Sequence, residues 1–118
     1  MKTNIQILTF VLVATVSLVS KGSEPKTYEG FLVIAPEVEV FQPCGSKAEL
    51  WLDYDQKTRE PMAKKYRELA KKPYEATFAV LSGYPGPKLD CGFCENFEGS
   101  FKVLKVIEQR RVRSADCR

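Results

Sequence analysis

Histidine is absent from this 118-residue chain, and the sequence contains only one tryptophan, two methionines and four cysteines. Without histidine, neither a Ser-His-Asp triad nor a Cys-His pair can form, which excludes two common nucleophilic sites. A glycine-rich phosphate loop is also missing, because residues 83–87 alternate glycine with tyrosine and proline as a turn does. Internal repeats and low-complexity tracts are lacking as well. We therefore expect one small domain without a catalytic constellation.

A strong excess of one charge is lacking too. The chain has 18 basic and 15 acidic side chains, and residues 1–22 contain Lys2 and Lys21 but no acid, so the remainder has 16 basic and 15 acidic side chains, a net charge of +1. Nucleic-acid binders usually gather a basic excess on one face, whereas these charges are interleaved. The short basic run at residues 110–113 is expected to be a solvated strand end. We expect no nucleic-acid partner.

The one long apolar run lies at the N-terminus, where residues 1–22 have the layout of a secretion signal. Lys2 precedes the apolar run Ile5–Val19, and the small residues Ser20 and Gly22 fit cleavage after Gly22, with cleavage after Ser20 as a second option. The run is shorter than the roughly 20 apolar residues of a membrane span, which favours cleavage over an uncleaved anchor. No cysteine lies near the cut to accept a lipid. We expect a periplasmic or secreted protein with no stable membrane span.

Hydrophobic periodicity predicts five strands and one helix in the remainder. Met62, Tyr66, Leu69 and Ala70 form one helical stripe. Asp55 or Thr58 is expected to cap this helix, Pro61 to lie in its first turn, and Pro73 to end it. Strands are expected at residues 28–34, 38–40, 48–54, 74–81 and 101–108, with a long connection at residues 83–99.

The order of these elements favours one fold class. A mainly β domain with a helix between its third and fourth strands has the order of the OB-fold, a partly open five-stranded Greek-key barrel. Another small α+β meander and a two-layer sandwich are the alternatives. Residues 23–27 are expected to be a disordered lead-in, and residues 28–118 a single OB-like domain.

The four cysteines all follow the predicted signal, and in an oxidising compartment such cysteines usually become disulfides. The simplest of the three pairings joins Cys44 to Cys117 and Cys91 to Cys94. A crossed pairing, Cys44 with Cys91 and Cys94 with Cys117, remains open.

The Cys91-Gly92-Phe93-Cys94 motif also admits a functional interpretation as a thiol redox or Cu/Zn site. A thioredoxin-type pair requires a helix directly after it, and none is predicted here. Two thiolates are too few for a closed zinc site unless Asp90, Glu95 or the other cysteines join them. We expect a structural disulfide and no cofactor.

Aromatic and acidic side chains supply weaker candidates. Phe41, Trp51 and Tyr84 could form a ligand platform of the kind that OB barrels use, with core packing or cover for a disulfide as the alternative. Two carboxylate pairs, Glu37/Glu39 and Asp53/Asp55, alternate along strands and are expected to be solvated.

Several short motifs resemble those of small bacterial envelope proteins and lipoprotein domains. They are Tyr28-Glu29-Gly30, the segment from Phe41 to Ser46 with Glu49 and Trp51 after it, the segment from Glu98 through Val106, and the closing Asp116-Cys117. These domains are similar to the C-terminal OB-type domain of the lipoprotein NlpE. The resemblance implies an OB-type barrel, a bond between the first and last cysteines, and no catalysis. This chain departs from it by lacking a lipidation cysteine and by adding Cys91 and Cys94.

Taken together, the sequence predicts an exported, non-enzymatic module with a structural or binding role. Its partner is undefined, with another envelope protein as one option. The competing hypothesis is a thiol-based redox or metal-binding protein that acts through Cys91 and Cys94.

Overall fold

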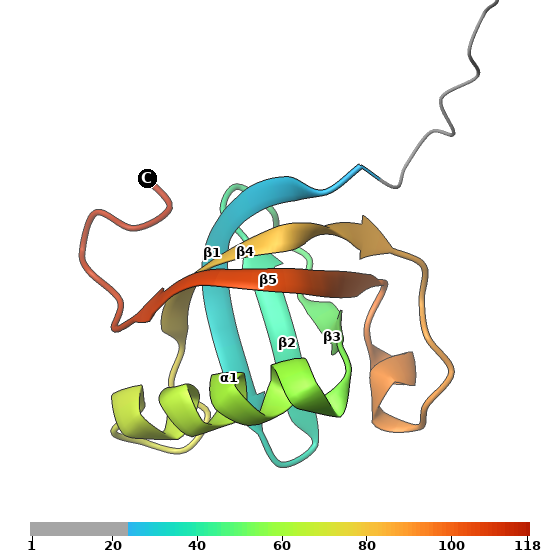
Figure 1. Ribbon diagram of the computed structural model, residues 1–118, viewed down its shortest axis with the longest axis horizontal. Coiled ribbons are helices and arrows are strands. Elements are labelled where there is room, and N and C mark those ends of the chain that lie inside the picture. The colour runs from blue at the N-terminus through green and yellow to red at the C-terminus, as the bar shows by residue number, and fades with distance from the viewer. Residues whose placement is uncertain (1–23) are drawn as a thin grey trace, which may run out of the picture.

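The computed structural model describes residues 24–118, so the predicted signal at residues 1–22 lies outside the described part of the chain. The protein is mainly β, with one α-helix and one short 3-10 helix (Figure 1). In chain order the elements are β1 (Lys26–Ala35), β2 (Val38–Pro43), β3 (Leu50–Asp53), α1 (Gln56–Leu69), β4 (Thr77–Gly86), η1 (Phe93–Asn96) and β5 (Ser100–Arg110). The predicted order of five strands with a helix between the third and fourth is confirmed. Because β1 begins at Lys26, residues 26 and 27 of the expected disordered lead-in belong to a strand.

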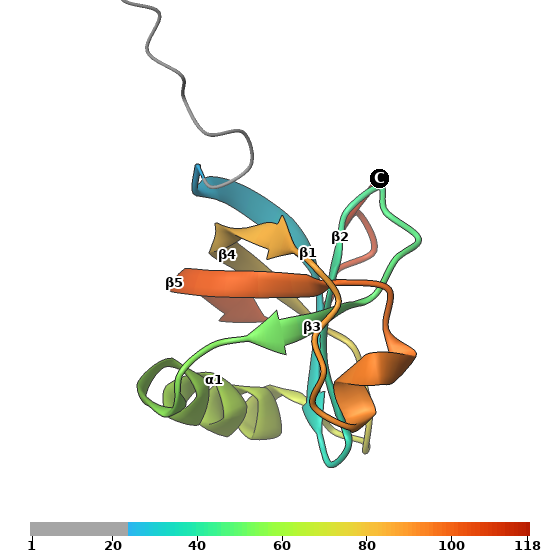
Figure 2. The same cartoon turned by 90° about the vertical axis from the view of Figure 1, so that its right-hand side faces the viewer.

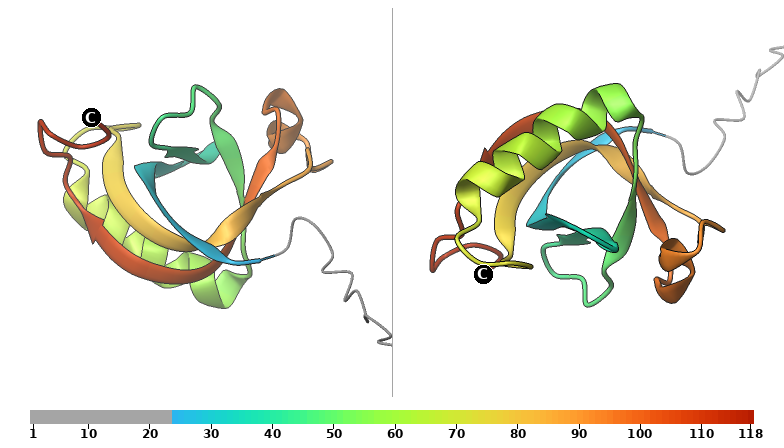
Figure 3. Two further views of the ribbon diagram at one scale, coloured as in Figure 1. Left: turned by 90° about the horizontal axis from the view of Figure 1, so that it is seen from above. Right: turned by 90° about the horizontal axis from the view of Figure 1, so that it is seen from below.

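The five strands pair in a closed order. Strand β1 is antiparallel to both β2 and β4, and β2 is antiparallel to β3. Strand β5 is antiparallel to β4 and parallel to β3. Every strand therefore has two hydrogen-bonded neighbours, in the order β1-β2-β3-β5-β4 and back to β1. Figure 3 shows the strands arranged around a common centre, with α1 across one side of the ring.

Helix α1 begins where Asp55 caps it. The Asp55 carboxylate accepts a hydrogen bond of 2.7 Å from the backbone N–H of Thr58, which satisfies one of the free donors of the first turn. Met62, Ala63 and Tyr66 are buried against the strands. Met62 and Tyr66 belong to the predicted stripe, whereas its other two members, Leu69 and Ala70, are half-buried. Pro61 lies inside the helix on its exposed side rather than in the first turn, and the helix ends at Leu69, before Pro73.

Strand β4 begins at Thr77, three residues later than predicted, and both β4 and β5 continue further than predicted because their pairing tolerates irregular residues. A Cβ on Gly83 would lie 1.8 Å from the Lys102 carbonyl oxygen, so only glycine allows β4 to continue against β5 through Gly86. In β5 the register skips Leu104 and Ile107, which have no partner residue in β4. Both side chains are about half exposed, so the two bulges interrupt the regular alternation of inward and outward residues along β5.

The core lies between the ring of strands and α1. Its buried members include Leu32, Phe41, Leu52, Met62, Leu81 and Phe101. A Cβ on Gly30 would lie 2.2 Å from the Gln42 carbonyl oxygen, so glycine here permits the close approach of β1 and β2. Among residues 24–118, no helix combines the length and apolar character that crossing a membrane requires.

Candidate functional site

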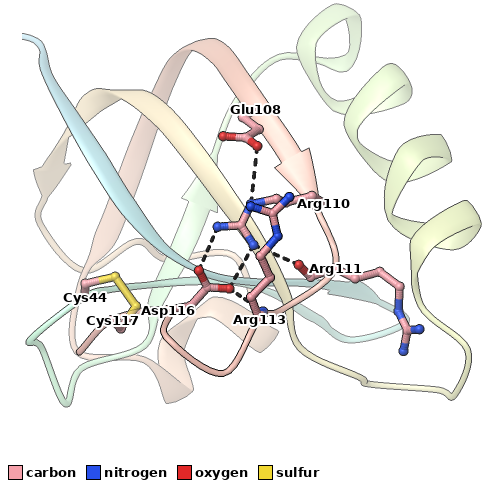
Figure 4. Close-up of polar contacts among 7 residues, drawn as sticks. All are labelled: Cys44, Glu108, Arg110, Arg111, Arg113, Asp116 and Cys117. Carbon is pink, nitrogen blue, oxygen red and sulfur yellow. Dashed lines mark hydrogen bonds and ion pairs between the residues drawn. A yellow bond between two sulfur atoms is a disulfide. The ribbon is translucent and has the colours of Figure 1, made fainter.

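Cys44 and Cys117 are joined in a disulfide that attaches the C-terminal segment to the end of β2 (Figure 4). Cys44 directly follows β2, and its backbone N–H donates to the Glu29 carbonyl oxygen at 2.8 Å. Cys117 is the second-last residue, and 73 positions separate the two cysteines. The bond therefore closes a covalent loop that contains β3, α1, β4 and β5, whereas β1 and β2 lie outside the loop.

A polar clasp beside this disulfide holds the same segment. Both terminal nitrogens of Arg110 donate to the Asp116 carboxylate, at 2.9 Å and 2.7 Å (Figure 4). The same guanidinium lies 4.0 Å from the centre of the Phe78 ring. The Asp116 side chain is only 8% exposed. Its pKa is lowered to about 2, chiefly by the Arg110 hydrogen bonds, and a backbone N–H from Arg113 adds to the effect. The predicted solvated tail is thus anchored through its first arginine.

Cys91 and Cys94 form the second disulfide, within the connection between β4 and β5. Figure 2 shows this connection and η1 on the far side of β3 from α1. Cys91 is exposed, whereas Cys94 is fully buried inside η1, and Phe93 between them is 53% exposed. Among the described residues, no three His, Cys, Asp or Glu side chains gather in a way that could hold a metal ion.

The predicted aromatic platform is wrong in one member, because Phe41 is fully buried in the core. Its ring lies 4.9 Å from that of Phe101. Phe41 pairs with Leu50, while Val40 pairs with Trp51. Since successive strand residues point to opposite faces, Phe41 and Trp51 are on opposite faces of the sheet.

The other two platform members are half-buried on the outer face. The Trp51 ring packs against Phe97 of the β4–β5 connection, with ring centres 5.5 Å apart. Tyr84 pairs with Lys102 of β5, which in turn pairs with Asp53 of β3. Strand β5 therefore separates Tyr84 from the strand that bears Trp51. The structure assembles a Trp51–Phe97 pair in place of the predicted three-residue platform.

A groove of about 550 Å³ lies between α1 and the β1–β2 hairpin, and we call it the helix–turn groove. Ile34–Glu37 of the hairpin forms one wall, and residues 70–74 after α1 form the other. The floor between them consists of Ala63 and Tyr66, which are both buried. Figure 1 shows the β1–β2 turn projecting beside α1 at the bottom of the molecule.

Both walls contain residues with a left-handed backbone. Glu37 has a φ of 65° and Tyr74 a φ of 64°, a region that residues other than glycine and asparagine seldom occupy. Pro36 and Glu37 form a two-residue loop between the paired Ala35 and Val38, and since proline fixes a negative φ, the turn is of type II. The Tyr74 hydroxyl donates to the Pro36 carbonyl oxygen at 3.3 Å and joins the walls. Such backbone strain is often found at binding sites.

One end of the groove is closed by a three-residue polar network. One oxygen of Glu39 accepts hydrogen bonds from the Tyr54 hydroxyl at 2.5 Å and from Arg59 Nε at 2.6 Å. Burial, followed by the bond to Glu39, raises the pKa of Tyr54 far above its ordinary value. The same carboxylate raises the pKa of Arg59. Glu39, like Glu37, was expected to be solvated. Its side chain is instead only 21% exposed and accepts hydrogen bonds from both Tyr54 and Arg59.

The opposite end of the groove is basic. Arg67, Lys71 and Lys72 line it, and among residues 24–118 none of the three forms an ion pair. The carboxylate of the neighbouring Glu75 is already hydrogen-bonded to other groups. It accepts hydrogen bonds from the backbone N–H groups of Lys71 and Lys72 and from Arg111, and Arg111 is the main cause of its lowered pKa.

Sequence patterns gave partial signals of this groove. The prolines at positions 36 and 73 mark both walls as turns, and Ala63 and Ala70 lie on one helical face. The proximity of residues 36 and 74 depends on tertiary packing, which no local pattern records.

Comparison with known proteins gives no further guide, because no family model, curated protein or solved structure matches this chain.

Proposed function

We propose that this protein is a non-enzymatic binding module that acts in the periplasm or outside the cell, and that its ligand occupies the helix–turn groove. The observation that supports this most directly is the groove itself. Ligand sites are usually concave, largely apolar and within about 300–1,000 Å³, with a few polar groups that fix orientation. The helix–turn groove has this size and this composition.

The protonation states around the groove argue against acid–base catalysis. A general acid or base works best when its pKa lies near the working pH. The raised pKa values of Tyr54 and Arg59 move both groups away from neutrality. The chain also has no histidine to take that role.

We further propose that the sheet is an OB-type barrel. The antiparallel order β1-β2-β3, the return of β4 to β1 and the parallel pairing of β3 with β5 support this proposal, as does the position of α1 between β3 and β4. This is also the fold that the resemblance to NlpE-type domains implies. The two disulfides are compatible with export into an oxidising compartment.

Amide NMR spectra of the purified protein test the binding site, with decanol as a neutral apolar probe. We expect decanol to shift the amide resonances of Ala35, Ala70 and Tyr74. Ala70→Trp should abolish these shifts, because Ala70 is only partly buried and a tryptophan there fills the groove.

Ala76→Trp is the matched control, because Ala76 is exposed and does not line the groove. It should leave the decanol shifts unchanged. Shifts that are confined to residues outside the groove, or that survive in Ala70→Trp, would show that the ligand site has been misplaced.

A second candidate function rests on the unequal exposure of Cys91 and Cys94. In dithiol–disulfide exchange, a partner thiolate attacks the accessible sulfur, here Cys91 Sγ, and displaces Cys94 as a thiolate. A second partner thiol then releases Cys91, so the pair gains two electrons while the partner's dithiol becomes a disulfide. Incubation in a glutathione redox buffer, followed by alkylation and mass spectrometry, tests this. A Cys91–Cys94 bond that stays fully oxidised excludes the exchange.

A further inference from the structure

We propose that the ligand of the helix–turn groove is a single-chain anionic amphiphile, whose apolar chain lies along α1 and whose anionic head lies against Arg67, Lys71 and Lys72. This inference rests on the proposed function, since it names the ligand class of the same groove. It concerns the dissolved amphiphile and not a bilayer surface.

The lining of the groove favours an apolar chain, because several of its polar side chains already have partners. The Tyr66 hydroxyl donates to the Glu75 carbonyl oxygen at 2.8 Å, and the Tyr74 hydroxyl donates to Pro36. Glu39 and Arg59 are bound to each other. A polar ligand body would therefore lose hydrogen bonds to water without full replacement, which costs free energy.

The charges of the lining residues are unevenly distributed along α1. Arg59 lies near the start of the helix and is neutralised by Glu39, whereas Arg67 lies eight positions later, or about 12 Å along the axis. Beyond it, Lys71 and Lys72 add two more positive charges, and the nearby Glu75 is bound to Arg111. Glu37 on the facing wall adds one negative charge, but the lining as a whole keeps a net positive charge. A ligand with a negative group at one end matches this arrangement.

These cations have another physical role that must be separated from ligand binding. Positive side chains in the last turn of a helix interact favourably with its dipole. That role would stabilise the fold but would give no preference between a neutral and an anionic ligand. The discriminating measurement is therefore head-group preference at constant chain length.

Titration calorimetry with decanoate, decanol and decyltrimethylammonium makes this comparison at concentrations where all three are monomeric. We expect decanoate to bind about tenfold more tightly than decanol, since the contribution of two or three exposed charges is of that order. Decyltrimethylammonium should bind most weakly. The preference for decanoate should fall as salt is added, because exposed charges are screened.

Arg67→Glu/Lys71→Glu should reverse the preference, so that decyltrimethylammonium binds more tightly than decanoate. The matched control is Lys64→Glu/Lys65→Glu, which makes the same charge change on exposed positions of the same helix outside the groove. It should retain the preference of the unaltered protein. Equal affinities for decanoate and decanol, or an equal loss of preference in the control, overturn the anionic head while leaving the groove as a binding site.

Two other outcomes are separable from these. If neither decanol nor decanoate binds in the groove, the proposed function itself is wrong. If decanoate fails to bind but the protein sediments with phosphatidylglycerol vesicles, the basic residues recognise a membrane surface and the amphiphile proposal is wrong.

Discussion

Removal of the two disulfides one at a time should show very different losses of stability. In the loop-entropy treatment, a crosslink stabilises the fold by restricting the unfolded chain, and the effect grows with the logarithm of loop length. The separation of 73 residues between Cys44 and Cys117 gives about 4.4 kcal/mol at 25 °C. The separation of three residues between Cys91 and Cys94 gives only about 1.6 kcal/mol.

The matched variants are Cys44→Ala/Cys117→Ala and Cys91→Ala/Cys94→Ala, in which no single thiol remains to exchange with the other bond. Alanine is chosen over serine because Cys94 is fully buried, and a buried hydroxyl would add a cost of its own. For a domain of this size, a loss of about 4.4 kcal/mol corresponds to a fall in Tm of roughly 20–35 °C.

Urea unfolding curves of the unaltered protein and both variants provide the measurement, with mass spectrometry to establish that the remaining disulfide is intact. The free energy of unfolding should fall by about 3 kcal/mol more for the Cys44/Cys117 variant. A loss as large or larger for the Cys91/Cys94 variant would refute the reasoning, because chain entropy would then not govern the contribution of either bond.

Three other variants test single contacts. Acidification should destabilise the unaltered protein more than the Asp116→Asn variant. The reason is that a carboxyl whose pKa is lowered to about 2 stabilises the fold fully above about pH 4 and loses this effect as the pH falls through 2. Parallel curves of unfolding free energy against pH for the two proteins would contradict this prediction. Glu39→Gln should lower the unfolding free energy by about 1–3 kcal/mol in urea titrations, because two charge-assisted bonds are lost or weakened, and no change would mean that solvent replaces them. Glu37→Gly should be about 1 kcal/mol more stable than Glu37→Ala in thermal melts, since only glycine adopts this φ without strain; the opposite order would show that the turn is unstrained.

The order of elements and the buried helix face could be predicted because both depend on local periodicity. Met62 and Tyr66 are spaced four apart and are both buried, as one helical face requires. Asp55 was one of two expected caps, and its carboxylate makes the capping bond. Such signals are contained within a few consecutive residues.

The errors arose where pairing between distant strands decided the local structure. Leu104 and Ile107 interrupt the alternation of β5 because neither has a partner residue in β4. Only the register between the two strands reveals these bulges. Gly83 marked a turn in the sequence, but in the structure it permits close contact between two strands. Phe41 joined a predicted platform because its face was unknown until its pairing with Leu50 fixed it.

The two ends of the helix–turn groove are held by bonds of unequal strength, which bears on how a ligand would enter. At one end, Glu39 accepts two short bonds, at 2.5 Å and 2.6 Å, from groups that are partly buried. At the other end, the exposed Tyr74 hydroxyl makes a single bond of 3.3 Å to Pro36. Charge-assisted bonds are roughly twice as strong as neutral ones, so the walls can separate more easily at Tyr74. That is the end where Lys71 and Lys72 lie, and therefore where the proposed anionic head would remain in contact with water.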